Sequence, residues 1–207
     1  GNTPILTVGT GATLDLNGAD DLSLTQLSGG GTILNVASRM VTLTANIASG
    51  TREFSASLQG NIALVKDGAG TLTLSGANSY TGGTVIKAST LKLGSATALG
   101  SSGTITFAGG TLELNGFDLT ISSVGSLTGT VTNSSTSKST LYMGADSANA
   151  TFGFNITGNI ALDKQSGSGT ITLKGTNSYT GGTLIEGGTL KLGSGTALGT
   201  VGDITFA

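Results

Sequence analysis

Asp20 and Asp21 form the one place in this sequence where two acidic residues are adjacent. Clustered carboxylates can bind Ca²⁺ or share the acid and base roles of sugar hydrolysis. In the second half of the chain the pair is reduced to the single residue Asp118. Aspartate also favours turns that face water. We therefore interpret Asp20 and Asp21 as a solvated turn and not as a catalytic or metal site.

The sequence lacks the residue types that several other kinds of chemistry require. The 207 residues include no cysteine and no histidine, which rules out disulfides, thiol chemistry and the most common general base. Arg39 and Arg52 are the only arginines, and neither recurs in the second half. A phosphate-binding glycine loop and a Ca²⁺-binding nonapeptide are also missing. The sequence predicts no catalytic, cofactor-binding or metal-binding residues, no cofactor, and a protein that is not an enzyme.

Two tyrosines at matching places, Tyr80 and Tyr179, are the remaining candidates for contact with a ligand. An aromatic ring can stack on a sugar, but it also contributes a large apolar surface to a core. Because both residues occupy the same place in a repeated motif, we interpret them as packing residues that lie over a turn.

Charged residues are few and scattered. The chain has 9 basic and 11 acidic residues, and charged residues make up 10% of it. Without a basic patch, electrostatic binding to nucleic acid or to an anionic membrane is not supported. We expect two pairs of opposite charge, Lys66 with Asp67 and Lys92 with Glu113, to be surface charges.

The charged residues and tyrosines discussed above must be positioned by short runs in which leucine alternates with a polar residue. Thr71-Leu72-Thr73-Leu74 and Thr111-Leu112-Glu113-Leu114 show the period of a half-buried strand. No segment carries the apolar spacing of an amphipathic helix, so almost no helix is expected. Aromatic residues make up only 4% of the chain, which predicts a narrow core of Leu, Ile and Val.

The chain is close to two copies of one unit. Between the segments 71–108 and 170–207, 27 of 38 residues are identical at an offset of 99. At an offset of 98, Phe54 matches Phe152 and Asn61 matches Asn159. We place the first copy at about residues 9–107 and the second, truncated copy at 108–207, within one continuous solenoid that spans 1–207. Because the second copy stops inside its motif, and because no leader or membrane-spanning segment is seen, we expect a fragment of a longer array.

Strands of this length and spacing fit a sandwich, a barrel or a β-solenoid. Irregular glycine-rich turns and a long repeat favour the solenoid, in which each coil buries its apolar side against the next. A coil of ~20–25 residues gives about nine coils. In that fold Asn78, Asn177, Asn17 and Asn115 would bond or stack at turns, and the Gly82-Gly83 corner would need positive φ. Gly83→Val should therefore cost more stability than a surface change such as Thr84→Val.

One motif resembles a known family. The segment from Leu64 to Gly94 contains GAGTLTLSGANSYTGGT, and it resembles the autotransporter-associated β-strand repeat, also called the passenger-associated transport repeat. The second copy matches from Leu162 to Gly193 but departs at Asp163, Gln165 and Ser166. The resemblance implies an all-β, right-handed parallel β-helix that belongs to the passenger of a type V secreted protein, displayed outside the outer membrane of a Gram-negative cell.

The resemblance also implies partners and a role. Further coils and a C-terminal translocator barrel of the same chain would follow, and host or neighbouring cells would be met at the surface. We expect a non-catalytic stalk or fibre of an adhesin. One alternative is a carbohydrate-active β-helix enzyme. A second is an ice-binding solenoid, suggested by Thr-x-Thr triplets that begin at Thr42, Thr71, Thr104 and Thr170.

Overall fold

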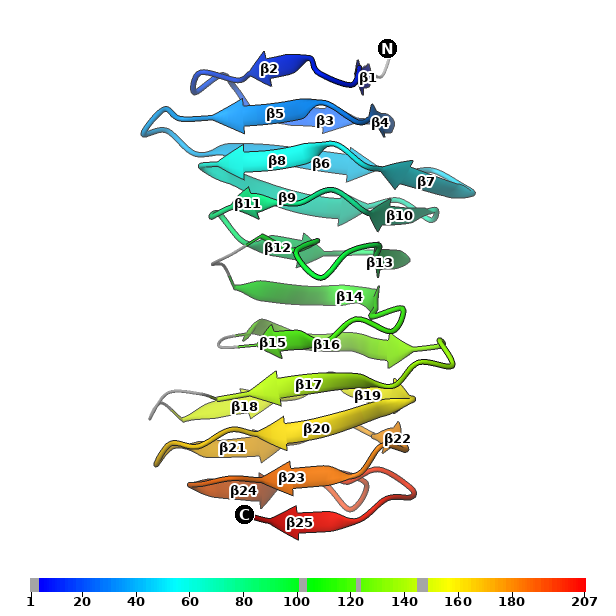
Figure 1. Cartoon of the computed structure of the whole chain (residues 1–207), viewed down its shortest axis with the longest axis vertical. Helices are drawn as coiled ribbons and strands as arrows, with labels where there is room; N and C mark the ends of the chain where they lie inside the picture. Colours follow the sequence, from blue (N-terminus) through cyan, green and yellow to red (C-terminus); the bar gives the residue numbers. More distant parts are fainter. Residues whose placement is uncertain (1–3, 101–103, 122–123, 145–148) are drawn as a thin grey trace. The chain divides into compact units, whose positions relative to one another are not determined.

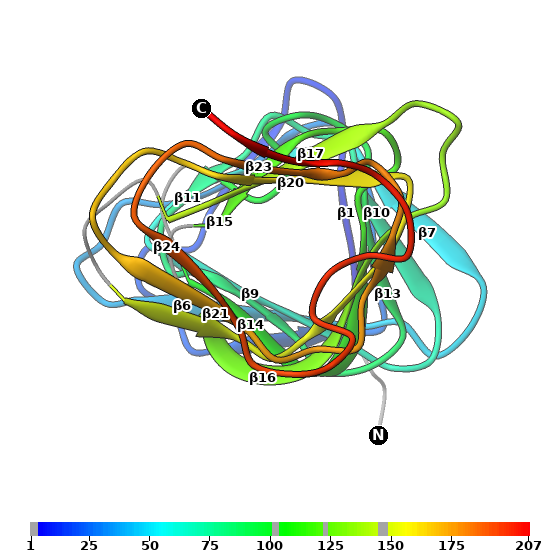
Figure 2. The same cartoon turned by 90° about the horizontal axis from the view of Figure 1, so that it is seen from below.

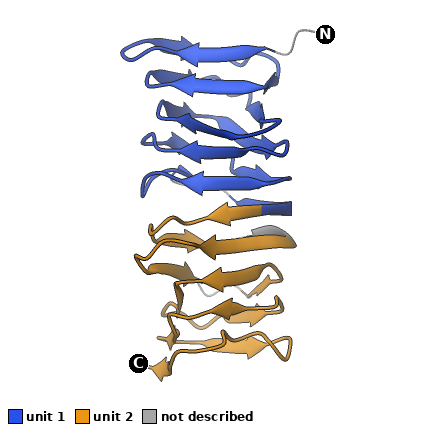
Figure 3. Cartoon of the chain, turned by 90° about the vertical axis from the view of Figure 1, so that its right-hand side faces the viewer, with its two compact units in different colours: residues 1–110 blue, residues 111–207 orange. Residues whose placement is uncertain are grey.

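The structure is a computed structural model that describes residues 4–100, 104–121, 124–144 and 149–207. It divides into two compact units, Gly1–Gly110 and Thr111–Ala207, coloured separately in Figure 3. We describe each unit by itself. In both units the described secondary structure consists of short strands, and every recorded strand pairing is parallel.

Unit 1 is built from four rows of parallel strands, labelled in Figure 1. Two rows are β1 (Ile5–Val8) with β4 (Gln26–Gly29), and β2 (Thr13–Asp15), β5 (Thr32–Asn35), β8 (Ser57–Gly60) and β11 (Ser79–Tyr80). The third row is β3 (Leu22–Leu24), β6 (Val41–Asn46), β9 (Ile62–Asp67), β12 (Thr84–Ile86) and the first residues of β14 (Ile105–Glu113). The fourth is β7 (Thr51–Phe54), β10 (Thr71–Leu74) and β13 (Thr90–Leu93).

Unit 2 repeats this plan with three rows of strands. The first joins the end of β14 to β16 (Val124–Asn133), β19 (Asn155–Gly158) and β22 (Ser178–Tyr179). The second is β15 (Leu119–Ile121), β17 (Ser139–Met143), β20 (Ile160–Lys164), β23 (Thr183–Ile185) and β25 (Ile204–Phe206), and the third is β18 (Ala150–Phe152), β21 (Thr170–Leu173) and β24 (Thr189–Leu192). Seen from below in Figure 2, β20 and β23 lie on one side of the coil and β21 on another.

The register shows how the coils stack. Leu72 pairs with Leu91, 19 residues later, whereas Ile33 pairs with Leu58, 25 residues later. One coil per pairing, with neighbours in parallel, is the geometry of a solenoid and not of hairpins. The predicted parallel β-solenoid with about nine coils and no helix is thus confirmed for the described residues. The right-handed sense of the coil stays a prediction, as does the division into two copies.

Alternating residues point into the coil and form the core. In β10, Leu72 and Leu74 are fully buried, while Thr71 and Thr73, which alternate with them, are half-buried. The expectation of a core without large rings is wrong, however. Tyr80, Tyr179 and Phe54 are the largest fully buried side chains. Aromatic residues are scarce in the sequence, but a buried ring contributes more apolar area than any aliphatic residue, so the few that are present are placed inside.

Two asparagines link successive coils, as expected from the sequence. Asn78 Oδ1 accepts a hydrogen bond from the Leu58 amide at 2.8 Å, and its Nδ2 donates to the Ala98 carbonyl at 2.7 Å. Asn177 repeats this arrangement in unit 2, where its Oδ1 accepts from the Ile156 amide at 2.9 Å. Because Asn78 bonds to the coil before its own and to the coil after it, we call this arrangement the asparagine bridge.

The glycine corner also has the predicted conformation. Gly83 has a φ of +82° and Gly182 a φ of +84°. A Cβ atom on Gly83 would lie 2.7 Å from the carbonyl oxygen of Thr104. Thr84, in contrast, is not the surface residue that we expected. It is 1% exposed, because its hydroxyl group turns inward to bond Tyr80.

Candidate binding surface

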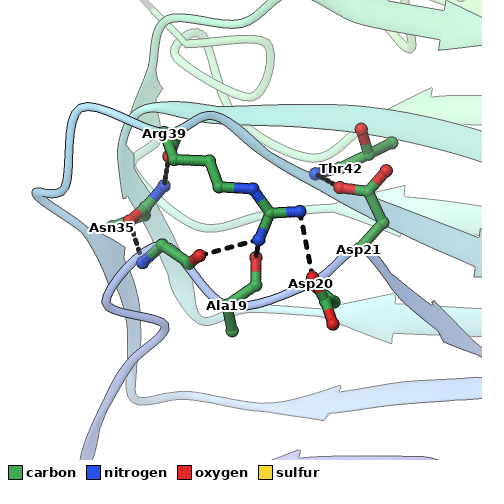
Figure 4. A network of polar contacts seen from close by, with 7 residues as sticks. Ala19, Asp20, Asp21, Asn35, Arg39 and Thr42 are labelled. Atoms are coloured by element: carbon green, nitrogen blue, oxygen red, sulfur yellow. Dashed lines mark hydrogen bonds and ion pairs between the residues drawn. The ribbon is translucent and has the colours of Figure 1, made fainter.

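Asp20 takes part in a local network that fastens a turn of unit 1 (Figure 4). The Arg39 guanidinium donates to the carbonyls of Gly18 and Ala19 at 2.8 and 2.6 Å and forms an ion pair with Asp20 at 3.0 Å. The Asp20 side chain is 98% exposed. An ion pair this exposed adds little stability, so the network holds the loop mainly through the two carbonyls.

Asp21 has a separate structural contact, which recurs in the second copy. Its Oδ1 accepts a hydrogen bond from the Thr42 amide at 2.8 Å, and Asp118 Oδ1 accepts one from the Thr140 amide at 2.6 Å. In both copies a carboxylate thus receives a backbone N–H group of the next coil. Asp20 and Asp21 are exposed residues whose carboxylates take part in different contacts.

Both repeated tyrosines are closed to ligands. Tyr80 and Tyr179 are 0% and 1% exposed. Their hydroxyl groups bond those of Thr84 and Thr183 at 2.6 and 2.8 Å. Burial raises the pKa of Tyr80 far above its ordinary value, although the hydrogen bond to Thr84 acts in the opposite direction. The interpretation of these tyrosines as packing residues agrees with this burial.

The expectation that Lys66 is a surface charge is wrong. Its side chain is 0% exposed, and Nζ donates to the carbonyls of Asp67 and Gly68 at 2.7 and 3.0 Å. Burial lowers the pKa of Lys66, and the Asp67 charge raises it by a smaller amount. Lys164, at the equivalent place, is also 0% exposed and donates to the Gln165 carbonyl at 2.8 Å. The long apolar stem of lysine fills the core while its ammonium group satisfies turn carbonyls.

Glu113 is likewise not a surface charge. It is 7% exposed, and its Oε1 accepts hydrogen bonds from the amides of Asn115 and Ser134 at 2.8 and 3.0 Å. The carboxylate therefore closes a turn of unit 2. Lys92, its expected partner, is half-buried on β13.

The threonine triplets do not build a regular array. Thr42 pairs with Ala63 and Thr44 with Val65 in the next coil, so the first triplet is not followed by another. A flat face made of repeated threonine pairs is therefore interrupted after one coil. This register gives no support to the ice-binding alternative.

An open groove lies on unit 2, over the outward side of β17, β20, β23 and β25. We call it the unit 2 groove; its volume is about 590 Å³. Its lining includes an aromatic ring, two carboxylates, an amine and small or aliphatic residues: Lys138, Tyr142, Asp163, Gly181, Leu184 and Asp203.

The groove depends on side chains that the first copy lacks. At the positions of Tyr142, Asp163 and Asp203, the first copy has Thr44, Val65 and Thr104. Met40, in place of Lys138, lies over Gly82, because a Cβ on Gly82 would be 2.7 Å from its Sδ. At Gly181 the nearest atoms are instead backbone atoms of Ile160 and Ala161. Sequence reasoning missed this surface, although the differences between the copies could have indicated it.

Asp163 is the most unusual ionisable group in the groove. Its Oδ1 is buried and has no hydrogen-bond partner within the described residues. Burial raises the pKa of Asp163, and the nearby Glu186 charge raises it further. The second copy therefore has a carboxylate at the position where the first copy has Val65, a buried residue that is 7% exposed.

Replacing Asp163 by valine, the residue of the first copy, should raise the melting temperature at pH 7. Above its raised pKa the folded chain contains a poorly solvated charge, and this cost is relieved as Asp163 gains a proton. The advantage of the variant should therefore shrink as the pH falls through the folded pKa towards about 3.9. Thermal unfolding at several pH values measures this. A variant that is less stable than the parent at pH 7 would contradict the prediction.

Among the described residues, no group of three or more acidic, histidine or cysteine residues is placed to hold a metal ion. Nor does the described part of the chain contain a helix long and apolar enough to span a membrane.

Comparison with protein families finds the repeat that the sequence resembles. The passenger-associated transport repeat matches residues 64–93 and 165–192. These two segments carry the strands β10 and β21 and the asparagine bridge that follows each of them. The matched residues therefore belong to the part of each copy that binds one coil to the next.

Comparison with curated proteins finds a relative that is 38% identical over 150 residues, the adhesin BmaC autotransporter of Brucella suis biovar 1 (strain 1330). The alignment covers 70% of this chain but 4% of the relative. No solved structure matches the chain significantly. The family match and the similarity to the adhesin agree with the resemblance seen in the sequence. The chain is a β-solenoid segment of the autotransporter passenger type that carries two passenger-associated transport repeats.

Proposed function

We propose that this chain is a non-catalytic display segment of an adhesin-like autotransporter passenger, outside the outer membrane of a Gram-negative cell. The observation that carries the proposal is the pair of passenger-associated transport repeats on a parallel β-solenoid. The 38% identity to a protein named as an autotransporter adhesin supports the same role.

The fold suggests how such a segment would work. Neighbouring coils are bonded by parallel backbone ladders, and at some coils also by an asparagine bridge or by Lys66, whose Nζ donates to the Ala88 carbonyl of the next coil. Because these contacts join neighbouring coils, stability builds up step by step along the stack. Coils that fold as they emerge from the cell would therefore favour outward movement, and the folded stack would hold another part of the passenger away from the membrane.

The proposed partners follow from the passenger type. A passenger of this kind continues in its own chain to a C-terminal translocator, and we propose that further coils lie between them. Surfaces of host or neighbouring cells are the proposed external partners. The scattered charges of the sequence give no reason to include nucleic acid or direct membrane insertion.

Surface labelling of intact cells tests the display role. An epitope tag in the exposed turn at residues 48–50 of this chain, expressed within the full-length protein, should be reached by antibody on unbroken cells. A periplasmic protein with the same tag serves as the control and should be labelled only after lysis. If the passenger tag also needs lysis, display at the surface is refuted.

The non-catalytic part of the proposal has its own test. The purified chain should release no reducing ends from a panel of neutral and acidic polysaccharides. Turnover that is lost in Asp20→Asn or in Asp163→Asn would show an enzyme and would overturn this part. Thermal unfolding should show that both variants are folded at the assay temperature, so that lost turnover is not mistaken for lost folding.

A further inference from the structure

We propose that the unit 2 groove binds an extended, uncharged oligosaccharide. The proposal concerns the isolated chain and does not depend on its display at a cell surface. It uses the side chains that distinguish the second copy from the first, and it assigns them to recognition of a sugar chain without cleavage.

The register of the strands gives the groove a repeating floor. Tyr142 pairs with Asp163, Asp163 with Leu184, and Leu184 with Thr205. These four side chains lie on successive coils, at the strand spacing of ~4.8 Å. A sugar residue in an extended chain has a similar length. An oligosaccharide that lies across the strands could therefore place one residue over each coil.

Apolar and polar side chains alternate along this row, and a sugar ring likewise presents both C–H groups and hydroxyl groups. Tyr142 and Leu184 are half-buried and offer apolar surface to the C–H face of a sugar ring. Asp163 and Asp203 line the groove, and a carboxylate accepts hydrogen bonds. Sugar hydroxyl groups can donate such bonds. Glycines at positions 181 and 182 keep the floor low enough for a ring to approach.

The charges of the groove select against acidic sugars. Asp163 and Asp203 line it, and Glu186 lies close enough to Asp163 to raise its pKa, while Lys138 supplies one positive charge. A uronic acid chain would bring like charges to this surface. A neutral chain would instead meet acceptors for its hydroxyl groups.

The first copy has the same kind of fold but different residues at the groove positions, so the groove does not follow from the fold alone. There Met40 covers Gly82, and the positions of Tyr142 and Asp163 hold Thr44 and Val65. The same scaffold thus exists in one chain with and without the groove. This pairing provides test variants whose new residues already occur in the fold.

Titration of the purified chain with cellohexaose and with chitohexaose tests the proposal, with hexagalacturonate as the acidic comparison. The chain has three tyrosines and no tryptophan, and two of these tyrosines are buried, so tyrosine fluorescence can report on Tyr142. Amide chemical shifts locate the binding. At least one neutral hexamer should perturb β17, β20 and β23 and leave β6 and β9 unchanged, and the acidic hexamer should bind more weakly.

Tyr142→Thr and Asp163→Val, each taken from the first copy, should weaken binding about tenfold or more. Lys87→Ala, on the first copy, should leave binding unchanged. The proposal is wrong if neither neutral hexamer perturbs these strands, or if the two groove variants bind like the parent. A tetralysine peptide that binds more tightly than either sugar would assign the groove to cationic ligands and would also overturn it.

Discussion

Replacing Asn78 by leucine is expected to lower the free energy of unfolding by about 2–6 kcal/mol, because two backbone groups lose their partners and each costs ~1–3 kcal/mol when buried and unpaired. Asn78 is 5% exposed, and its amide bonds the Leu58 N–H and the Ala98 C=O at 2.8 and 2.7 Å. Leucine has a similar size but can replace neither bond. Denaturant unfolding of the purified chain measures the loss.

The asparagine bridge offers an internal check and a matched control. Asn177→Leu should cause a loss of similar size, because Asn177 is 3% exposed and bonds the Ile156 amide and the Ala197 carbonyl. Asn46→Leu changes an exposed asparagine at the end of β6 and should alter stability little. If Asn78→Leu and Asn46→Leu had equal effects, the bridge would not hold the coils together.

Gly83→Val is the second large loss that we expect, at about 2–4 kcal/mol or more. A φ of +82° disfavours any residue with a Cβ atom, by ~1–2 kcal/mol for the left-handed region and by more for a branched residue. The added Cβ would also lie 2.7 Å from the Thr104 carbonyl oxygen, which belongs to the backbone and cannot move aside easily. Thermal and denaturant unfolding should both report the loss.

The control for Gly83→Val must be chosen from the structure. Thr84→Val, the obvious neighbour, would remove the hydroxyl group that bonds Tyr80 at 2.6 Å inside the core. Thr73→Val is a better control, because Thr73 lies half-buried on the outward side of β10. A Gly83→Val variant as stable as Thr73→Val would show that the corner tolerates a side chain.

The sequence was most informative about the backbone. Alternation in segments such as Thr71–Leu74 and the 98-residue or 99-residue offset between the copies led to parallel stacked coils, because both patterns repeat many times. The same patterns also placed Asn78 and Gly83 at corners. A pattern that recurs at equivalent positions in both copies assigns a strand or a turn more reliably than one short segment does.

The errors concern single polar residues whose burial a pattern cannot reveal. Lys66 and Glu113 look like solvated charges in the sequence, but each finds backbone groups at a turn of the next coil. Those partners are about 20 residues away, so local sequence gives no sign of them. The unit 2 groove was missed for a related reason, since Tyr142 and Asp163 become neighbours only through the register of β17 and β20.

On each strand the inward residues pack the core and the outward residues face solvent. This separation affects how the sequence of such a chain can evolve. Inward positions are kept nearly the same in both copies, as with Leu74 and Leu173, whereas one outward position holds Val65 in the first copy and Asp163 in the second. A duplicated copy would already carry the information needed to dock onto its parent. Its outer face could then acquire new specificity by a few substitutions while the inward residues that stack the coils stay unchanged.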